Sequence, residues 1–139
     1  MALNLQSLAK SIAALRTSIE VCDKNWGSVD EDMQDTLRAG VIQNFEVAYE
    51  QSWKMLQRWI KRNVSPEDAV HPRTRKELFR IAARKGLIQD PAPWFEYAEA
   101  RIMTSHTYDE GSALSVFETA REFVIDAETL LRRLEELND

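Results

Sequence analysis

Residues 31–62, EDMQDTLRAGVIQNFEVAYEQSWKMLQRWIKR, form the longest periodic stretch of the chain and decide its fold class. Apolar or small residues recur in steps of three and four at Met33, Leu37, Val41, Phe45, Ala48, Ser52, Met55 or Leu56, and Trp59. This spacing predicts a single helix about 45 Å long. Tyr49, Trp53 and Ile60 widen its apolar arc, so the helix is expected to be central in a bundle or partly covered by another subunit.

The flanking segments show the same periodicity. Residues 3–24 carry one apolar stripe, and residues 109–137 carry a near-heptad stripe from Leu114 to Leu137. Shorter helices are expected at 74–85 and from Asp90-Pro91 to beyond Arg101. The chain has four Gly and four Pro in 139 residues and no run of alternating β-branched residues. We therefore predict one all-α domain over residues 1–139, an antiparallel up-down bundle of four to five helices.

Local residues predict where the helices begin and end. Ser28 or Asp30 is expected to cap the long helix, and Thr74-x-x-Glu77 resembles a capping box. A basic last turn followed by Gly86 predicts a helix end there. Between these helices Ser65-Pro66 begins a helix-like signal that His71-Pro72 interrupts, so only a short turn is expected.

Composition excludes several classes of protein. Cys22 is the only cysteine, which rules out an internal disulfide and a cysteine-rich zinc site. No apolar run approaches the roughly 20 residues of a membrane span, and the first residues contain no signal-peptide core, so a cytoplasmic protein is expected.

The charge is unevenly distributed along the chain. Residues 54–85 hold ten Lys and Arg against three Asp and Glu, whereas the rest of the chain holds eight basic and twenty acidic residues. Residues 54–85 could therefore bind phosphate groups, whereas the rest of the chain would repel them. A solvated basic helix face explains the same feature equally well.

The stretch RIMTSHTYDE, residues 101–110, lies where two predicted helices meet and carries a polar, chemically capable cluster. It contains Arg101, His106 and Tyr108 in the spacing R-x4-H-x-Y, followed by Asp109-Glu110. Arg is a permanent bidentate phosphate donor, and His titrates near neutral pH. The pair therefore suits chemistry at a phosphodiester.

This motif resembles the R-x4-H-x-Y motif of HEPN-domain proteins. Residues 104–110, TSHTYDE, and residues 41–46, 49–50 and 53–54 of the long helix are similar to the HepT-like group called nucleotidyltransferase substrate-binding proteins. The resemblance implies a HEPN helical bundle, commonly a homodimer, paired with a separately encoded minimal nucleotidyltransferase as toxin and antitoxin. It departs from the pattern at Ile102, where active HEPN ribonucleases commonly have Asn, Asp or His.

The resemblance also implies roles for individual residues. Arg101 and His106 would be the catalytic pair of a metal-independent ribonuclease, and Tyr108 the residue to which the partner transfers AMP. Ser105, Asp109 and Glu110 would support them. A single chain offers one such His, because His71 lies far away in sequence, and a two-fold dimer would supply a second.

Each of these residues also has a simpler interpretation. Arg101 has no acidic residue three or four positions before it, although Glu96, Glu99 or Asp109 could still pair with it. His106 alone would be a capping or packing residue, and Glu46 and Glu50 an exposed acidic face. No metal site is expected, since His106, Asp109 and Glu110 lack further ligands at a fixed spacing, and no cofactor is expected.

Three functions remain open on the sequence. The first is a HEPN ribonuclease toxin, which Arg101, His106 and Tyr108 together favour. The second is a non-catalytic substrate-binding subunit of a nucleotidyltransferase complex, which Ile102 favours. The third is a helical oligomerisation module.

Overall fold

The computed structural model describes residues 2–63 and 74–138, and over these residues it consists of five α-helices and two short 3₁₀ helices. The α-helices are α1 (Gln6–Asn25), α2 (Glu31–Asn63), α3 (Arg75–Arg84), α4 (Pro91–Met103) and α5 (Glu110–Leu137). The 3₁₀ helices are η1 (Trp26–Ser28) and η2 (Thr104–His106). The predicted all-α bundle, with short third and fourth helices, is confirmed.

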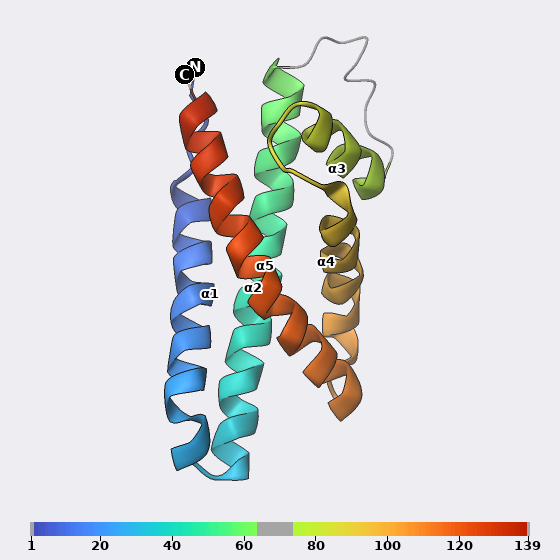
Figure 1. Ribbon diagram of the computed structural model, residues 1–139. Coiled ribbons are helices and arrows are strands. Elements are labelled where there is room, and N and C mark those ends of the chain that lie inside the picture. Colours follow the sequence, from blue (N-terminus) through green and yellow to red (C-terminus); the bar gives the residue numbers. More distant parts are fainter. Residues whose placement is uncertain (1, 64–73, 139) are drawn as a thin grey trace.

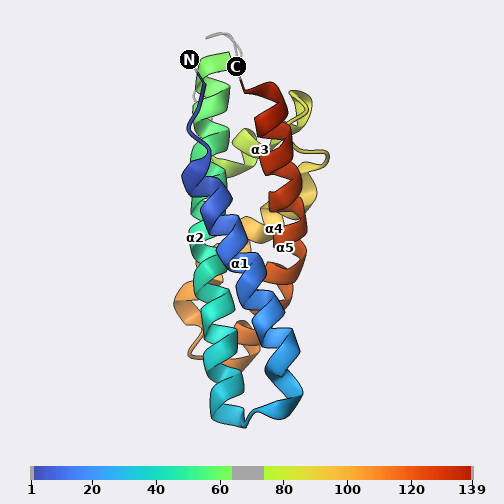
Figure 2. The same ribbon diagram turned by 90° about the vertical axis from the view of Figure 1, so that its left-hand side faces the viewer.

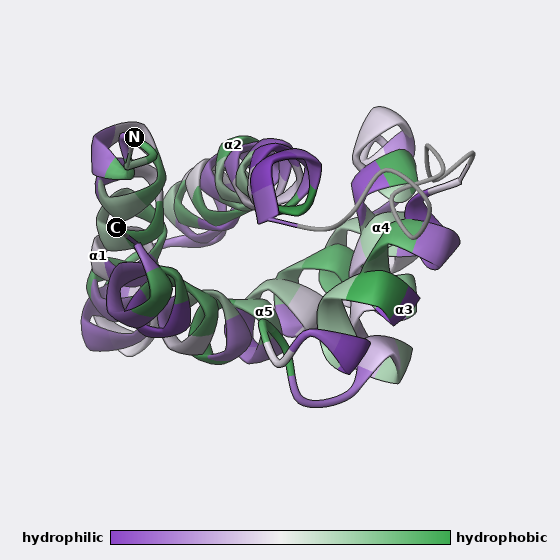
Figure 3. Cartoon of the chain, turned by 90° about the horizontal axis from the view of Figure 1, so that it is seen from above, coloured by the Kyte–Doolittle hydropathy of each residue, from purple (hydrophilic) through white to green (hydrophobic). Residues whose placement is uncertain are grey.

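The helices surround one core. α1 and α2 run antiparallel and are joined through η1, and α5 returns diagonally across them (Figures 1 and 2). Seen from above, α1, α2, α4 and α5 enclose the interior, and α3 lies beside α4 (Figure 3). Both termini lie at the same end of the bundle (Figure 1), where Leu3 N donates to Asn138 Oδ1 at 2.8 Å and Asn138 Nδ2 donates to Leu3 O at 2.9 Å.

The centre of the core is an aromatic cluster that joins three helices. Phe123 of α5 is fully buried, and its ring centroid lies 5.2 Å from Phe45 of α2 and 5.1 Å from Tyr97 of α4. The Tyr97 hydroxyl donates a hydrogen bond to Asp126, and burial, together with this hydrogen bond, raises the pKa of that phenol. These contacts fix the position of α4 against α2, which matters for the site described below.

The predicted stripes are mostly buried, with exceptions at helix ends. α2 is central in the bundle: Tyr49 is buried along with its main stripe, as expected from its wide apolar arc. Met33 and Leu114, however, are 47% and 43% exposed, so their assignment to buried stripes was wrong. Met33 lies in the first turn of α2, ahead of the first buried residue, Val41, whereas Leu114 follows the buried Ala113 and lies on the side of α5 that faces solvent. None of the described helices combines the length and apolar character needed to cross a membrane.

The predicted helix starts and stops are confirmed. A side-chain oxygen accepts a hydrogen bond from a backbone N–H of the following helix at Asp30 (from Met33), Thr74 (from Glu77), Asp90 (from Ala92) and Asp109 (from Ser112). Gly86 has φ +78°, and Leu87 N donates to Ala82 O at 2.9 Å, which closes α3 in a Schellman-type turn. The turn expected around Ser65-Pro66, and His71, lie outside the described residues.

Candidate functional site

The candidate site is the reversal between α4 and α5. Arg101 lies on the last turn of α4, η2 carries Ser105 and His106, and Asp109 caps α5 by accepting hydrogen bonds from the N–H and the hydroxyl of Ser112. Asp109 N also donates to His106 O at 3.2 Å. The segment is therefore held at both ends, and Asp109, expected as a supporting site residue, fixes the start of α5.

Arg101 is directed at α2. Its Nη1 lies 3.4 Å from Glu46 Oε2, and its Nε lies 3.3 Å from Glu50 Oε1. Glu46 and Glu50 are one turn apart on α2, so both carboxylates meet one guanidinium. The sequence analysis left Glu96, Glu99 and Asp109 as candidate partners, but the structure pairs Arg101 with α2. Local spacing within α4 could not reveal a partner on another helix.

Thr104 joins Arg101 to Glu46. Its Oγ1 accepts a hydrogen bond from Arg101 Nη1 at 2.9 Å and lies 3.0 Å from Glu46 Oε2. The same oxygen lies 2.6 Å from Arg101 O, so its single hydrogen serves one of two acceptors. Sequence reasoning did not identify Thr104 as a site residue, although its position three residues after Arg101 puts both on one side of the helix end.

Ile102, by contrast, takes no part in this network. Its side chain is 67% exposed. In the described structure the hydroxyl that contacts the Arg101 guanidinium is therefore that of Thr104, and Ile102 contributes no polar group.

A second guanidinium completes the cluster. Arg75 Nη1 of α3 lies 3.3 Å from Glu50 Oε1, the oxygen that also faces Arg101. The Arg75 guanidinium carbon lies 4.6 Å from the ring centroid of Trp53 and 5.4 Å from that of Tyr49. Burial raises the pKa of the Tyr49 phenol. Two arginines and two glutamates make the cluster neutral as a whole, so its carboxylates orient Arg101 and balance its charge.

The remaining motif residues face solvent. His106, Ser105 and Glu110 are exposed, and Tyr108 is 87% exposed. The His106 and Tyr108 rings meet edge to face, with centroids 6.1 Å apart. The structure thus groups the predicted residues in two sets, Arg101 held against α2 and His106 with Tyr108 on the surface.

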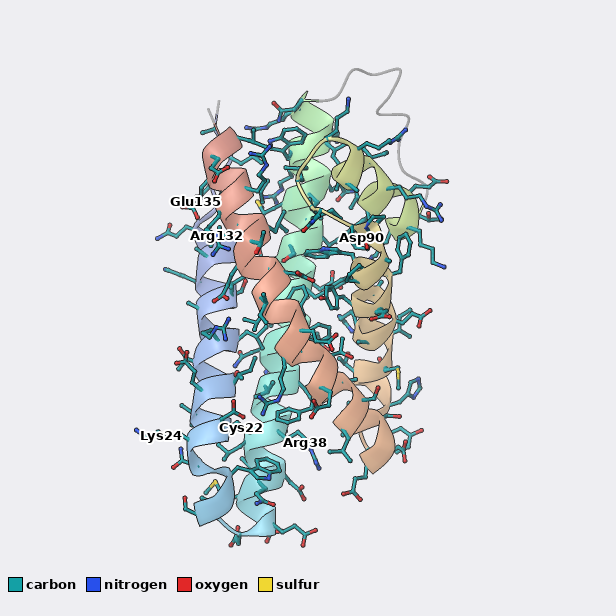
Figure 4. The ribbon with its side chains drawn as sticks, in the orientation of Figure 1. Cys22, Lys24, Arg38, Asp90, Arg132 and Glu135 are labelled. Carbon is teal, nitrogen blue, oxygen red and sulfur yellow. The ribbon has the colours of Figure 1, made fainter. Side chains whose placement is uncertain are left out.

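A cavity of about 490 Å³ lies beside Tyr108, between α2 and the start of α5. Its lining includes Arg38, Gln43 and Glu46 from α2 and Thr104 and Thr107 from the reversal. Arg38 projects from the N-terminal half of α2 (Figure 4) and pairs with Asp35 at 3.0 Å. Within the described residues no group of three His, Cys, Asp or Glu side chains is arranged to hold a metal ion.

Known proteins similar to this chain place it in a family. Residues 3–136 match the family model described as nucleotidyltransferase substrate binding protein like. The chain is 37% identical to the probable ribonuclease HepT of Haemophilus influenzae over 138 residues, which cover 98% of this chain and 94% of that protein.

A solved structure from Haemophilus influenzae agrees with this fold. It is described as revealing the fold of a substrate binding domain of a nucleotidyltransferase, and it superposes with a TM-score of 0.86 at 36% identity. The alignment covers 95% of this chain and 99% of that one. The resemblance inferred from residues 101–110 is therefore confirmed, and the chain belongs to the nucleotidyltransferase substrate-binding protein family.

Proposed function

We propose that the protein is a HEPN-type, metal-independent endoribonuclease and the toxin partner of a minimal nucleotidyltransferase. The observation that carries the proposal is the oriented Arg101, held by Glu46, Glu50 and Thr104, five residues before an exposed His106. A sequence identity of 37% to a probable ribonuclease over almost the whole chain supports it.

In the proposed reaction the 2′-hydroxyl of RNA attacks the adjacent phosphorus, and the bond to the 5′-oxygen of the next nucleotide breaks. Arg101 would bind the phosphate, whose negative charge grows in the transition state, through guanidinium N–H groups left over from its contacts with α2. His106 would take the proton from the 2′-hydroxyl or give one to the leaving oxygen. The products are a 2′,3′-cyclic phosphate and a 5′-hydroxyl.

One His per site supplies only one of these two proton transfers. A homodimer that places two Arg101/His106 pairs around one two-fold axis would supply both. The exposure of His106 and Tyr108 supports this arrangement, because both side chains are free to meet a second chain or a substrate.

Ile102 does not argue against catalysis as strongly as the sequence suggested. The polar residue usual at this position is thought to help position the catalytic pair. Here the Thr104 hydroxyl accepts a hydrogen bond from Arg101 Nη1 at 2.9 Å. Thr104, two residues after Ile102, therefore offers a polar group that can position Arg101.

The proposed control by the partner acts at Tyr108. Its phenol is 87% exposed beside His106, where a nucleotidyltransferase with bound ATP could reach it. Attack of the phenol oxygen on the α-phosphorus of ATP, with the phenol proton passing to the partner or to solvent, would form a phosphodiester to AMP and release pyrophosphate. The added negative charge next to the site would compete with RNA phosphate for Arg101.

The alternative is a non-catalytic substrate-binding subunit of a nucleotidyltransferase complex. Its support is the ion pairing of Arg101, whose charge the glutamates of α2 already balance. The solved relative, which is described as a substrate binding domain, also supports it.

An RNA-cleavage assay separates the two functions. Purified protein is incubated with single-stranded RNA in EDTA, and the rates are compared with those of Arg101→Ala and His106→Ala. Loss of the phosphate contact or of the proton-transfer group should lower the rate about a hundredfold each. Absence of cleavage by the wild-type protein, or equal cleavage by all three, would reject the ribonuclease and leave the binding subunit.

A further inference from the structure

The strongest charge feature outside the motif lies on α2 and α3. Three exposed cations follow one face of α2 at spacings of four and three residues, Lys54, Arg58 and Lys61. Three more follow one face of α3 at spacings of four, namely Lys76, Arg80 and Arg84. We call these six residues the α2–α3 basic surface. α3 packs beside the C-terminal half of α2 (Figure 1), so the two rows belong to one end of the molecule.

The cations of this surface differ from most other arginines of the structure in their contacts. None of the six has an ion pair within the described part of the chain, whereas Arg16, Arg75, Arg101 and Arg121 all have one. Lys76 Nζ and the Arg80 guanidinium carbon instead lie 5.6 and 5.4 Å from the ring centroid of Phe95 on α4. The ring holds both cations on one side of α3 without itself carrying a negative charge.

The basic surface continues into the candidate site. Arg75 begins α3 and shares Glu50 with Arg101, so one carboxylate separates the first cation of α3 from the motif arginine. On α2, Glu50, which pairs with Arg101, lies one turn before Lys54, the first cation of the α2 row. A chain bound at Arg101 and running toward α3 therefore meets the α2–α3 basic surface within a short distance.

The charge of the rest of the molecule favours this direction. Outside residues 54–85 the chain carries eight basic and twenty acidic residues, which repel a polyanion. We propose that the α2–α3 basic surface binds the phosphate backbone of single-stranded RNA on one side of the scissile phosphate. This inference rests on the proposed function and extends it by placing the substrate, without sequence readout, along the C-terminal part of α2 and along α3.

The test measures binding of an RNA that cannot be cleaved. A fluorescein-labelled oligonucleotide with 2′-O-methyl groups at every position lacks the attacking hydroxyl, and its affinity is followed by fluorescence anisotropy over a range of NaCl concentrations. The variant Lys76→Glu/Arg80→Glu removes two cations from the surface. The matched control is Lys10→Glu/Lys24→Glu, which makes the same change in net charge at exposed positions of α1; Lys24 lies far from α3 in Figure 4.

We expect the Lys76→Glu/Arg80→Glu variant to bind the RNA at least about tenfold more weakly. The slope of log affinity against log salt concentration should be smaller in magnitude by about 1.4, because each phosphate contact on a single strand contributes about 0.7 to that slope. The control should stay within about twofold of the wild type. Lys76→Gln/Arg80→Gln should show the same change in slope, and circular dichroism of each variant shows whether α3 is intact.

Equal losses in the α3 variant and the α1 control would overturn the proposal, because net charge alone would explain them. Unchanged RNA binding with lost binding of the purified nucleotidyltransferase would also overturn it and would assign the surface to an acidic protein partner. The probe cannot be cleaved, so the outcome does not depend on catalysis. Failure of the separate cleavage assay would reject the proposed function alone.

Discussion

Glu50→Gln is the substitution that most directly probes how Arg101 is held. Glu50 Oε1 lies 3.3 Å from Arg75 Nη1 and 3.3 Å from Arg101 Nε, so one carboxylate serves two guanidinium groups. Gln keeps the shape of the side chain and removes its charge. The three side chains are between 27% and 37% exposed, so solvent screens both pairs.

The expected loss follows from these two pairs. At about 0.5 to 1 kcal/mol for each partly exposed pair, Glu50→Gln should lower the free energy of unfolding by about 1 to 2 kcal/mol. For a chain of this size the melting temperature should fall by about 3 to 8 °C. The loss is expected to be somewhat larger at low salt, where charges are less screened.

The assay is urea unfolding followed by circular dichroism at 222 nm, in low and in high salt. Glu99→Gln is the matched control, because Glu99 is exposed on α4 and has no ion pair among the described residues; it should change stability by less than about 0.5 kcal/mol. If Glu50→Gln unfolds at the same urea concentration as the control, the carboxylate does not hold the two arginines. The reasoning about the orientation of Arg101 would then fail.

Four further substitutions test the fold, each measured by urea or thermal unfolding. Gly86→Ala places a Cβ at φ +78° and should lower the free energy of unfolding by about 1 kcal/mol. Gly40→Ala lies inside α2, where the added Cβ has no atom within 4 Å beyond its own stretch of helix, and should raise the free energy of unfolding by about 0.5 to 1 kcal/mol. Changes of the same sign in the two variants would contradict the backbone conformation at Gly86. Phe123→Ala removes the central ring of the core and should cost about 3 to 5 kcal/mol, and a loss below about 1 kcal/mol would refute its burial. The hydrogen bond from Arg121 holds the pKa of Asp23 below its ordinary value, so this contribution is complete above about pH 4 and is lost as pH falls through the lowered pKa. Asp23→Asn should therefore cost less than about 1 kcal/mol at pH 7, and this difference should shrink as the pH falls below about 4; a difference that stays constant in acid would contradict the ion pair.

The helices could be predicted because their signals are local. The buried stripe of α2 and the caps at Asp30, Thr74 and Asp90 each depend on residues within a few positions of one another. The error at Met33 arose where a stripe continues ahead of the packed part of α2, and the error at Leu114 arose at the edge of the buried face of α5, next to the buried Ala113. Sequence period shows roughly which side of a helix is apolar, but it does not show where the buried face ends around the helix or how far along it a neighbour extends.

The candidate site was only half predictable for the same reason. Arg101, His106 and Tyr108 stand out through their spacing, and this made the family resemblance visible. The contacts of Arg101 with Glu46 and Glu50 join positions more than fifty residues apart, and the role of Thr104 depends on them. Such contacts follow from the packing of α4 against α2, which periodicity alone does not fix.

The chemical ends of the RNA fragments test the central claim most directly. A short single-stranded RNA is incubated with the protein in EDTA, beside His106→Ala at equal concentration, and the fragments are analysed by mass spectrometry. Attack by the 2′-hydroxyl predicts a fragment ending in a 2′,3′-cyclic phosphate and one beginning with a 5′-hydroxyl, with both products reduced about a hundredfold in the variant. Fragments ending in a 3′-hydroxyl, cleavage that EDTA abolishes, or equal cleavage by His106→Ala would contradict the account.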